Sequence, residues 1–271
     1  MRPAEAGAGR APAAEPGAAS LSVVVPCFNA AGTLDRLIER VLGAVAGLAD
    51  DWELILVNDG SADRSWERIV EWAGRDERVR GIDLTRNFGQ HNALLAGIAA
   101  ARMEVIVTLD DDLQSPPEEI PKLLSGLERG ADVVYGAPIE RNQPLHRRLA
   151  SIGIRATLLA LTRSEAKARV SGFRALRARV GRSIQMPRGR RVSVDALLRG
   201  ATGRFAVVDV RHESRRAGRS GYTLPVLVRH AAAEITGSLP LGPIRGRNQA
   251  YAIRAVTGEA RSGSARFDGA S

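Results

Sequence analysis

The chain has 271 residues, a formal net charge of +9 at pH 7 and a single cysteine, Cys27. This length allows one large α/β domain with enough core to fold alone, and one cysteine excludes a disulfide framework and suits a reducing cytosol. The charge is uneven: residues 1–140 carry 13 basic and 23 acidic side chains, whereas residues 141–271 carry 26 basic and 7 acidic ones. A basic second half suits an anionic partner such as a phosphate, a membrane surface or nucleic acid.

The first half of the chain alternates short β-branched runs with amphipathic segments. Residues 1–19 are rich in Ala, Gly and Pro and lack an apolar run, which predicts a disordered leader rather than a signal peptide. After them, strands are expected at 21–25, 53–57, 79–84, 104–109 and 131–135, and helices at 34–45, 64–74, 90–101 and from Pro116 to Gly130. This alternation predicts an α/β fold with a mostly parallel, doubly wound sheet flanked by helices.

Polar clusters follow three of the expected strands. They contain Asn29, residues 58–61 with Asp63, and residues 110–114. Ligands of doubly wound sheets bind beyond the carboxyl ends of the strands, so we expect these clusters to form one site. A dinucleotide-binding domain would show G-x-G-x-x-G after its first strand, and "PCFNAAGTL" has a single glycine, which argues against a nicotinamide dehydrogenase.

The periodic pattern is weaker beyond residue 140. Amphipathic helices are expected at 144–162 and 222–236 and a strand at 204–212, and no segment has the ~20 apolar residues of a membrane span. The predicted organisation is therefore a leader at 1–19, a ligand-binding part at 20–140, a basic part at 141–237 and a polar, disordered tail at 238–271.

Three adjacent carboxylates stand out in "TLDDDLQSPPEEIP", residues 108–121. Two like charges ~4 Å apart repel by about 1–4 kcal/mol, so a cation is expected beside them. Asp110 and Asp112 flank Asp111 at the end of the expected strand, so alternation points these two side chains the same way. Two such carboxylates suit Mg²⁺ or Mn²⁺, which also holds substrate phosphates. The alternative is a solvated acidic loop that caps the helix at Pro116.

The motifs together resemble a known family. "VVVPCFN", "LVNDGSADRS", "RNFGQHNALLAGIAAA", "TLDDDLQSPPEEIPKLL" and "ADVVYG" are similar to family 2 glycosyltransferases of the GT-A fold. More narrowly, they resemble the polyprenyl-phosphate sugar transferases, which include dolichol-phosphate mannose synthases and undecaprenyl-phosphate aminoarabinose transferases. "HRRLAS", "SGFRALR" and "HESRRAGRSGYTL" continue the match, so that the resemblance covers about residues 20–237.

The resemblance implies a role for each matching residue. The nucleotide of a UDP- or GDP-sugar donor would lie against Pro26, Asn29, Asp59 and Asp110. The metal ligands would be Asp110, Asp112 and Gln114, with Asp112 counted as catalytic. The phosphate of a polyprenyl phosphate acceptor would be held by Arg147 and Ser151, which are also counted as catalytic, and by Arg215 and Ser220. Asp111 occupies a position where the family often has Ala and is not expected to be a ligand.

Other interpretations remain open. A soluble hydroxyl acceptor would need a general base, for which Asp195 is the candidate. The alternative interpretation of Asp195 is an exposed charge at the start of a helix. Relatives often continue into two membrane helices where this chain has a polar tail, so an inactive remnant is a further alternative. Nucleic acid is not an expected partner, because the basic half lacks aromatic interleaving. We expect a cytoplasmic protein at the inner membrane face, as a homo-oligomer or with a membrane-protein partner.

Overall fold

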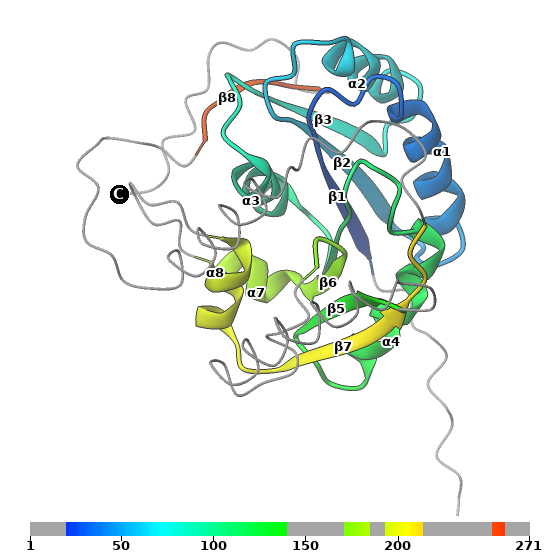
Figure 1. Cartoon of the computed structure of the whole chain (residues 1–271), viewed down its shortest axis with the longest axis vertical. Coiled ribbons are helices and arrows are strands. Elements are labelled where there is room, and N and C mark those ends of the chain that lie inside the picture. Colours follow the sequence, from blue (N-terminus) through cyan, green and yellow to red (C-terminus); the bar gives the residue numbers. More distant parts are fainter. Residues whose placement is uncertain (1–19, 140–170, 185–192, 214–250, 258–271) are drawn as a thin grey trace, which may run out of the picture.

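The computed structural model describes residues 20–139, 171–184, 193–213 and 251–257. Within them one eight-stranded sheet has the order β7-β5-β6-β4-β1-β2-β3-β8 (Figure 1). The strands are β1 (Leu21–Cys27), β2 (Trp52–Asn58), β3 (Val79–Leu84), β4 (Val105–Thr108), β5 (Val133–Pro138), β6 (Arg174–Arg177), β7 (Phe205–Val210) and β8 (Ile253–Val256).

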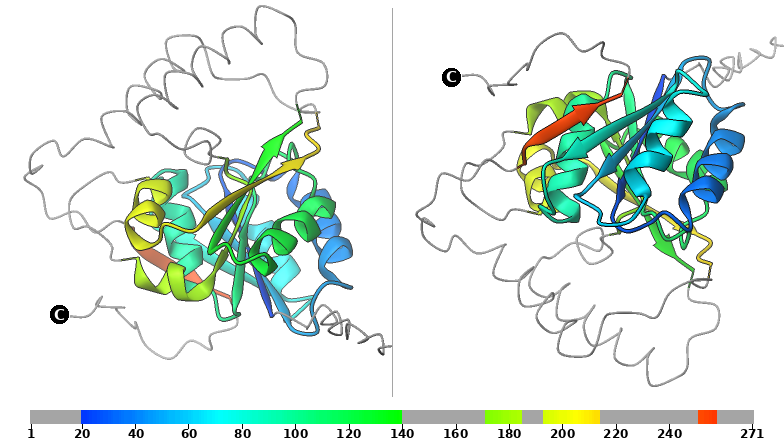
Figure 2. Two further views of the ribbon diagram at one scale, coloured as in Figure 1. Left: turned by 90° about the horizontal axis from the view of Figure 1, so that it is seen from below. Right: turned by 90° about the horizontal axis from the view of Figure 1, so that it is seen from above.

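Helices cover both faces of the sheet (Figure 2). One face packs against α1 (Leu34–Val45), α2 (Ser65–Ala73) and α4 (Ile120–Glu128), which follows the short 3-10 helix η1 (Pro117–Glu119). The other face packs against α3 (Gln90–Ala100), α7 (Ala178–Ser183) and α8 (Val194–Ala201). Strands buried on both faces explain the continuous apolar runs of β1 and β2, neither of which has an exposed residue.

The pairing pattern places the carboxyl ends of four strands at one edge. β1 is parallel to β2 and β4, and β2 is parallel to β3, so that all four strands end on the same side. Two strands run against this direction: β6 lies antiparallel between β4 and β5, and β8 lies antiparallel on β3. The expected α/β sheet is confirmed, with these two antiparallel additions.

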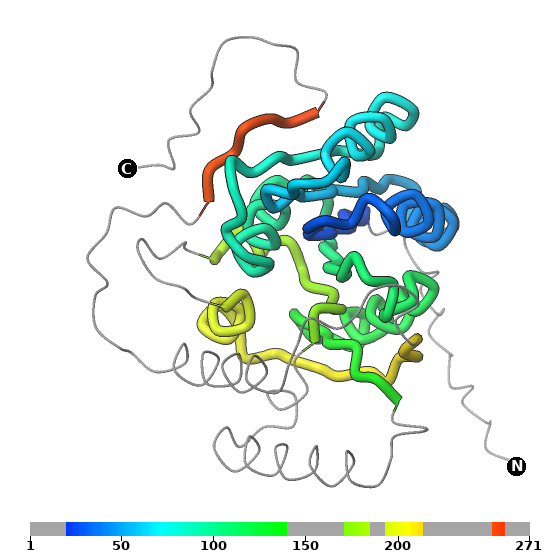
Figure 3. The backbone as a smooth tube through the Cα atoms, turned by 45° about the horizontal axis from the view of Figure 1, so that its top comes forward, coloured from blue at the N-terminus to red at the C-terminus, as the bar shows by residue number. Residues whose placement is uncertain are grey.

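Two differences from the sequence expectations concern individual segments. Residues 253–256 form β8 beside β3 (Figure 3), so the prediction of disorder is wrong for this part of 238–271. β6 and α7 were not predicted, and α8 was expected only as the helix start assumed in the alternative interpretation of Asp195. The expected helices at 144–162 and 222–236 lie outside the described residues. Of the helices in the described part of the chain, none is long and apolar enough to cross a bilayer.

Candidate functional site

The loops that follow β1 and β2 are joined by hydrogen bonds. The Asp59 amide donates to the Cys27 carbonyl over 2.9 Å, and the Asn29 amide donates to Ser61 Oγ over 3.0 Å. Asn29 Oδ1 in turn accepts from the Ala62 amide over 2.9 Å. Asn29 has φ 52°, a left-handed conformation that Asn tolerates better than most residues. The structure therefore brings the predicted nucleotide-binding residues Asn29 and Asp59 into adjoining loops, while Pro26 is buried within β1.

Asp59 connects these loops to a third, the β3–α3 loop. Its two carboxylate oxygens accept the amide hydrogens of Phe88 over 2.7 Å and of Gly89 over 2.9 Å. Gly60 has φ +64°, and a Cβ there would lie 2.3 Å from the carbonyl carbon of Arg86, so a side chain would not fit. Burial raises the pKa of Asp59 despite the two backbone hydrogen bonds, which act in the opposite direction. Asp59 thus orders the wall of the site, and its contact with a nucleotide stays a prediction.

The three carboxylates lie in a turn and not in a strand, because β4 ends at Thr108. Strand alternation therefore does not set the directions of these three side chains. Asp111 faces β1, where its Oδ2 accepts the Phe28 amide hydrogen over 3.1 Å. Asp112 Oδ1 accepts the Gln114 amide hydrogen over 3.1 Å, across Leu113 at φ 59°. A left-handed conformation costs a non-glycine residue about 1 kcal/mol, and such strain is common at functional sites.

Asp110 is held from two other elements. Gln90 of α3 donates from Nε2 to Asp110 Oδ1 over 2.6 Å. A Cβ on Gly172 would lie 2.5 Å from both carboxylate oxygens of Asp110, so a side chain at residue 172 would displace that carboxylate. Gly172 itself is fixed, because Thr108 Oγ1 donates to its carbonyl over 2.6 Å. Gln90 and Gly172 were not among the expected site residues, although both lie in motifs that carry the resemblance.

The residues present fit a divalent cation that arrives with a phosphate group. No group of three or more His, Cys, Asp and Glu side chains in the described part of the chain could hold an ion by itself. Asp110 and Asp112 offer carboxylates from one turn, and Gln114 offers an amide oxygen. Mg²⁺ is usually bound by one or two carboxylates together with substrate phosphates, which matches this donor set.

The pKa of Asp111 is raised to about 6, first by burial and then by the charges of Asp110 and Asp112. In the unfolded chain its pKa is near the ordinary 3.8, so the folded state binds the proton more tightly. The resulting stability is fully present below about pH 4 and is lost as the pH rises through 6.

We therefore expect the wild type to lose roughly 2 kcal/mol of unfolding free energy relative to Asp111→Asn between pH 4 and pH 7. Urea denaturation of both proteins in EDTA, at steps of half a pH unit, measures this difference. Asn keeps an oxygen for the Phe28 amide and cannot titrate. Stability curves that run parallel over this range would contradict the assigned pKa.

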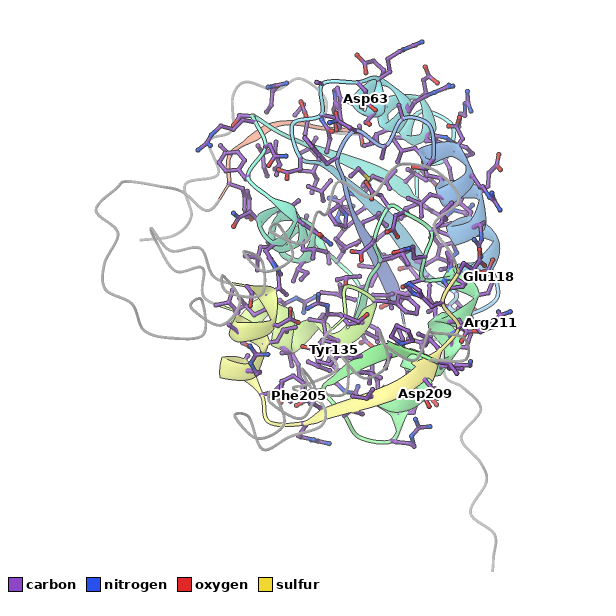
Figure 4. The ribbon with its side chains drawn as sticks, viewed as in Figure 1. Asp63, Glu118, Tyr135, Phe205, Asp209 and Arg211 are labelled. Carbon is purple, nitrogen blue, oxygen red and sulfur yellow. The ribbon has the colours of Figure 1, made fainter. Side chains whose placement is uncertain are left out.

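Asp195 lies in the first turn of α8 and is only 4% exposed, so the expectation of an exposed helix-start charge is wrong. Its Oδ1 accepts from the Tyr135 hydroxyl over 2.9 Å and pairs with the guanidinium of Arg174, which is 2% exposed. Tyr135 is fixed from its other side by stacking on Phe205, with ring centroids 6.2 Å apart (Figure 4). These contacts give Asp195 a structural role, and its use as a base stays untested.

A charged cluster anchors the carboxylate turn from outside. The Glu213 amide donates to the Gln114 carbonyl over 2.8 Å, and the Arg40 guanidinium of α1 bridges Glu213 and Glu118 over 3.0 and 2.8 Å. Arg211 lies on the same side of the molecule as Glu118 (Figure 4) and pairs with buried Glu119 over 2.6 Å.

The predicted acceptor residues Arg147, Ser151, Arg215 and Ser220 lie outside the described residues.

Sequence comparisons show which family the chain resembles. A family model described as "Glycosyl transferase family 2" matches residues 22–185, more than half of the chain. An undecaprenyl-phosphate 4-deoxy-4-formamido-L-arabinose transferase of Photorhabdus laumondii is 34% identical over 239 residues, which are 88% of this chain and 73% of that protein. The enzyme of the same name from Pectobacterium carotovorum is 36% identical over 210 residues, 77% of this chain and 64% of that protein. The chain thus spans about two thirds to three quarters of these relatives.

Among solved structures, the fold is similar to that of glucosyl-3-phosphoglycerate synthase from Mycobacterium tuberculosis, solved with Mn²⁺, UDP and phosphoglyceric acid. The TM-score is 0.61 at 22% identity, over 81% of this chain and 77% of that one. This similarity confirms the expected GT-A-like fold.

Proposed function

The chain belongs to glycosyl transferase family 2, and we propose that it transfers a sugar from a nucleotide diphosphate donor to polyprenyl phosphate, with inversion at the anomeric carbon. The observation that carries this proposal is the turn of three carboxylates at the carboxyl edge of the sheet, with Asp110 fitted against Gly172 and the loops of Asn29 and Asp59 beside it. The names of the curated relatives support a polyprenyl phosphate as acceptor.

In this proposal the described residues bind and orient the donor. The nucleoside lies against the loops that contain Asn29 and Asp59, next to the end of β1 at Pro26. Asp110, Asp112 and Gln114 hold Mg²⁺ or Mn²⁺, which when bound neutralises the charge of the departing diphosphate. Gln90 and Gly172 keep the Asp110 carboxylate in one place.

The acceptor supplies its own nucleophile. A phosphate monoester is largely ionised at pH 7, so its oxygen attacks the anomeric carbon without a general base. The bond from that carbon to the donor diphosphate breaks, and a single displacement inverts the centre. Arg147 with Ser151, and Arg215 with Ser220, are the residues proposed to hold the acceptor phosphate. We place this reaction at the membrane because its acceptor is a lipid, and at the cytoplasmic face because the single cysteine suits a reducing cytosol.

The burial and pairing of Asp195 argue against a soluble hydroxyl acceptor. Such an acceptor requires Asp195 to receive a proton, and this carboxylate is buried between Arg174 and Tyr135. Both partners contact the same oxygen, Oδ1, and the carboxylate is only 4% exposed, which leaves little access for a hydroxyl acceptor. The proposal needs no such base.

The test is release of nucleoside diphosphate from a panel of UDP- and GDP-sugars with Mn²⁺, with and without undecaprenyl phosphate. We expect release from one donor that depends on the lipid and is abolished by EDTA. Release that needs only a soluble alcohol would move the assignment to the Asp195 mechanism. A folded protein that releases nothing from any donor would be an inactive remnant.

A further inference from the structure

The C-terminal strand β8 contacts the sheet beside the proposed donor site. It pairs with β3 in antiparallel register, with Asp83 opposite Ala255. At one end, the Thr85 amide donates to the Ala252 carbonyl over 2.9 Å. At the other end, the Gly81 amide donates to Thr257 Oγ1 over 2.8 Å. Only the Thr85 end of β8 lies at the carboxyl edge of the parallel strands, where the donor loops are.

Arg254 of β8 contacts a buried carboxylate at that edge. Its guanidinium lies 3.3 Å from Asp83 Oδ2 and donates to the Thr85 carbonyl over 2.6 Å. The Asp83 side chain is 2% exposed and that of Arg254 is 60% exposed. A buried carboxylate is costly unless it is paired and hydrogen-bonded, and Arg254 supplies the charge from the solvent side.

Asp83 also contacts Asn58, the last residue of β2, from which the next loop begins. Its second oxygen, Oδ1, accepts from Asn58 Nδ2 over 2.7 Å, between residues that are paired across β2 and β3. Asn58 Oδ1 accepts the Ser61 amide hydrogen over 3.3 Å, and Ser61 Oγ is the acceptor for the Asn29 amide. A series of side-chain contacts therefore connects Arg254 to both nucleotide-facing loops.

A second route passes through the backbone. Thr85, held by β8 on its amide and by Arg254 on its carbonyl, begins the loop that ends at Phe88 and Gly89. The amides of these two residues are the donors to Asp59. The β3–α3 loop is thus fixed at its start by β8 and at its end by Asp59.

We propose that Arg254 is a positioning residue for the donor pocket: it neutralises Asp83 and orders the 58–61 and 85–89 loops that receive the nucleotide. The role assigned to these loops rests on the proposed function, whereas the ordering itself does not. Segment 251–257, which sequence patterns assign to a featureless tail, is by this inference a working part of the transferase domain.

The test compares Arg254→Met with Thr257→Val in the full chain. The first removes the cation and keeps the stem, and the second removes a hydrogen bond at the far end of the same strand. In the absence of ligand, we expect Arg254→Met to speed hydrogen exchange of the backbone amides of Ser61, Phe88 and Gly89. We also expect it to weaken binding of the nucleotide that the wild type binds, UDP or GDP, by about fivefold. Arg254→Lys should restore part of the amide protection and part of the nucleotide affinity. Thr257→Val should leave the exchange rates and the affinity near those of the wild type.

Two results would overturn the inference. Unchanged exchange and binding in Arg254→Met would show that the pairing with Asp83 orders nothing, and equal effects of Arg254→Met and Thr257→Val would show that β8 acts only as a structural edge. If the wild type binds neither nucleotide, the proposed function fails, and exchange at the same three amides still decides whether Arg254 orders the loops.

Discussion

Asp112→Asn is expected to lower lipid-dependent release of nucleoside diphosphate by about 100- to 1,000-fold, while the metal-free protein melts no lower than the wild type. Asn retains Oδ1 as acceptor for the Gln114 amide, so the turn keeps its shape. The change removes one of three crowded negative charges, which relieves repulsion on Asp111. Loss of activity without loss of stability is the behaviour of a ligand-binding carboxylate and not of a structural one.

The matched control is Asp111→Asn in the same turn. Asp111 faces the Phe28 amide and not the partners of Asp110 or Asp112, so we expect its release rate to stay within about tenfold of wild type. Initial rates over a Mn²⁺ titration, with melting temperatures in EDTA, measure both variants. Equal losses would mean that the turn acts through its summed negative charge rather than through two specific ligands.

The first half of the fold was predictable because its signals are local. A run such as Leu54–Val57 is apolar on both faces only in a strand covered by helices, and the structure buries it completely. The position of the site followed from the same topology, since parallel strands gather their carboxyl ends at one edge. The elements that were missed depend on distant partners. β8 is short and partly exposed, and it exists because β3 offers a free edge.

The details of the site were less predictable for the same reason. Gln90 and Gly172 lie 20 and 62 positions from Asp110 in the sequence, and nothing in their own surroundings marks them as its neighbours. The three carboxylates were found from their charges, but their orientations are set by a turn with Leu113 in a left-handed conformation, which no strand pattern predicts. Asp195 was noticed as a lone acid in a basic region, and its actual partner, Arg174, stands on β6, which was not predicted.

Asp195→Ala is expected to lower the free energy of unfolding by about 3–5 kcal/mol, because it leaves the buried guanidinium of Arg174 without its carboxylate. The Tyr135 hydroxyl loses its acceptor as well. Arg174 has few other hydrogen-bond partners. Its Nε is the one buried side-chain nitrogen or oxygen among the described residues without a hydrogen-bond partner. Urea denaturation at pH 7 measures the loss.

The control for Asp195→Ala is the double variant Arg174→Met with Asp195→Leu, which removes both charges and fills the space. We expect it to recover most of the lost stability, because apolar replacement of a buried ion pair is often neutral. Its turnover with the lipid acceptor, per folded molecule, should then approach wild type, since the proposed mechanism needs no base. A double variant that is stable but has lost lipid-dependent release would contradict the base-free mechanism and would make Asp195 a candidate catalytic base.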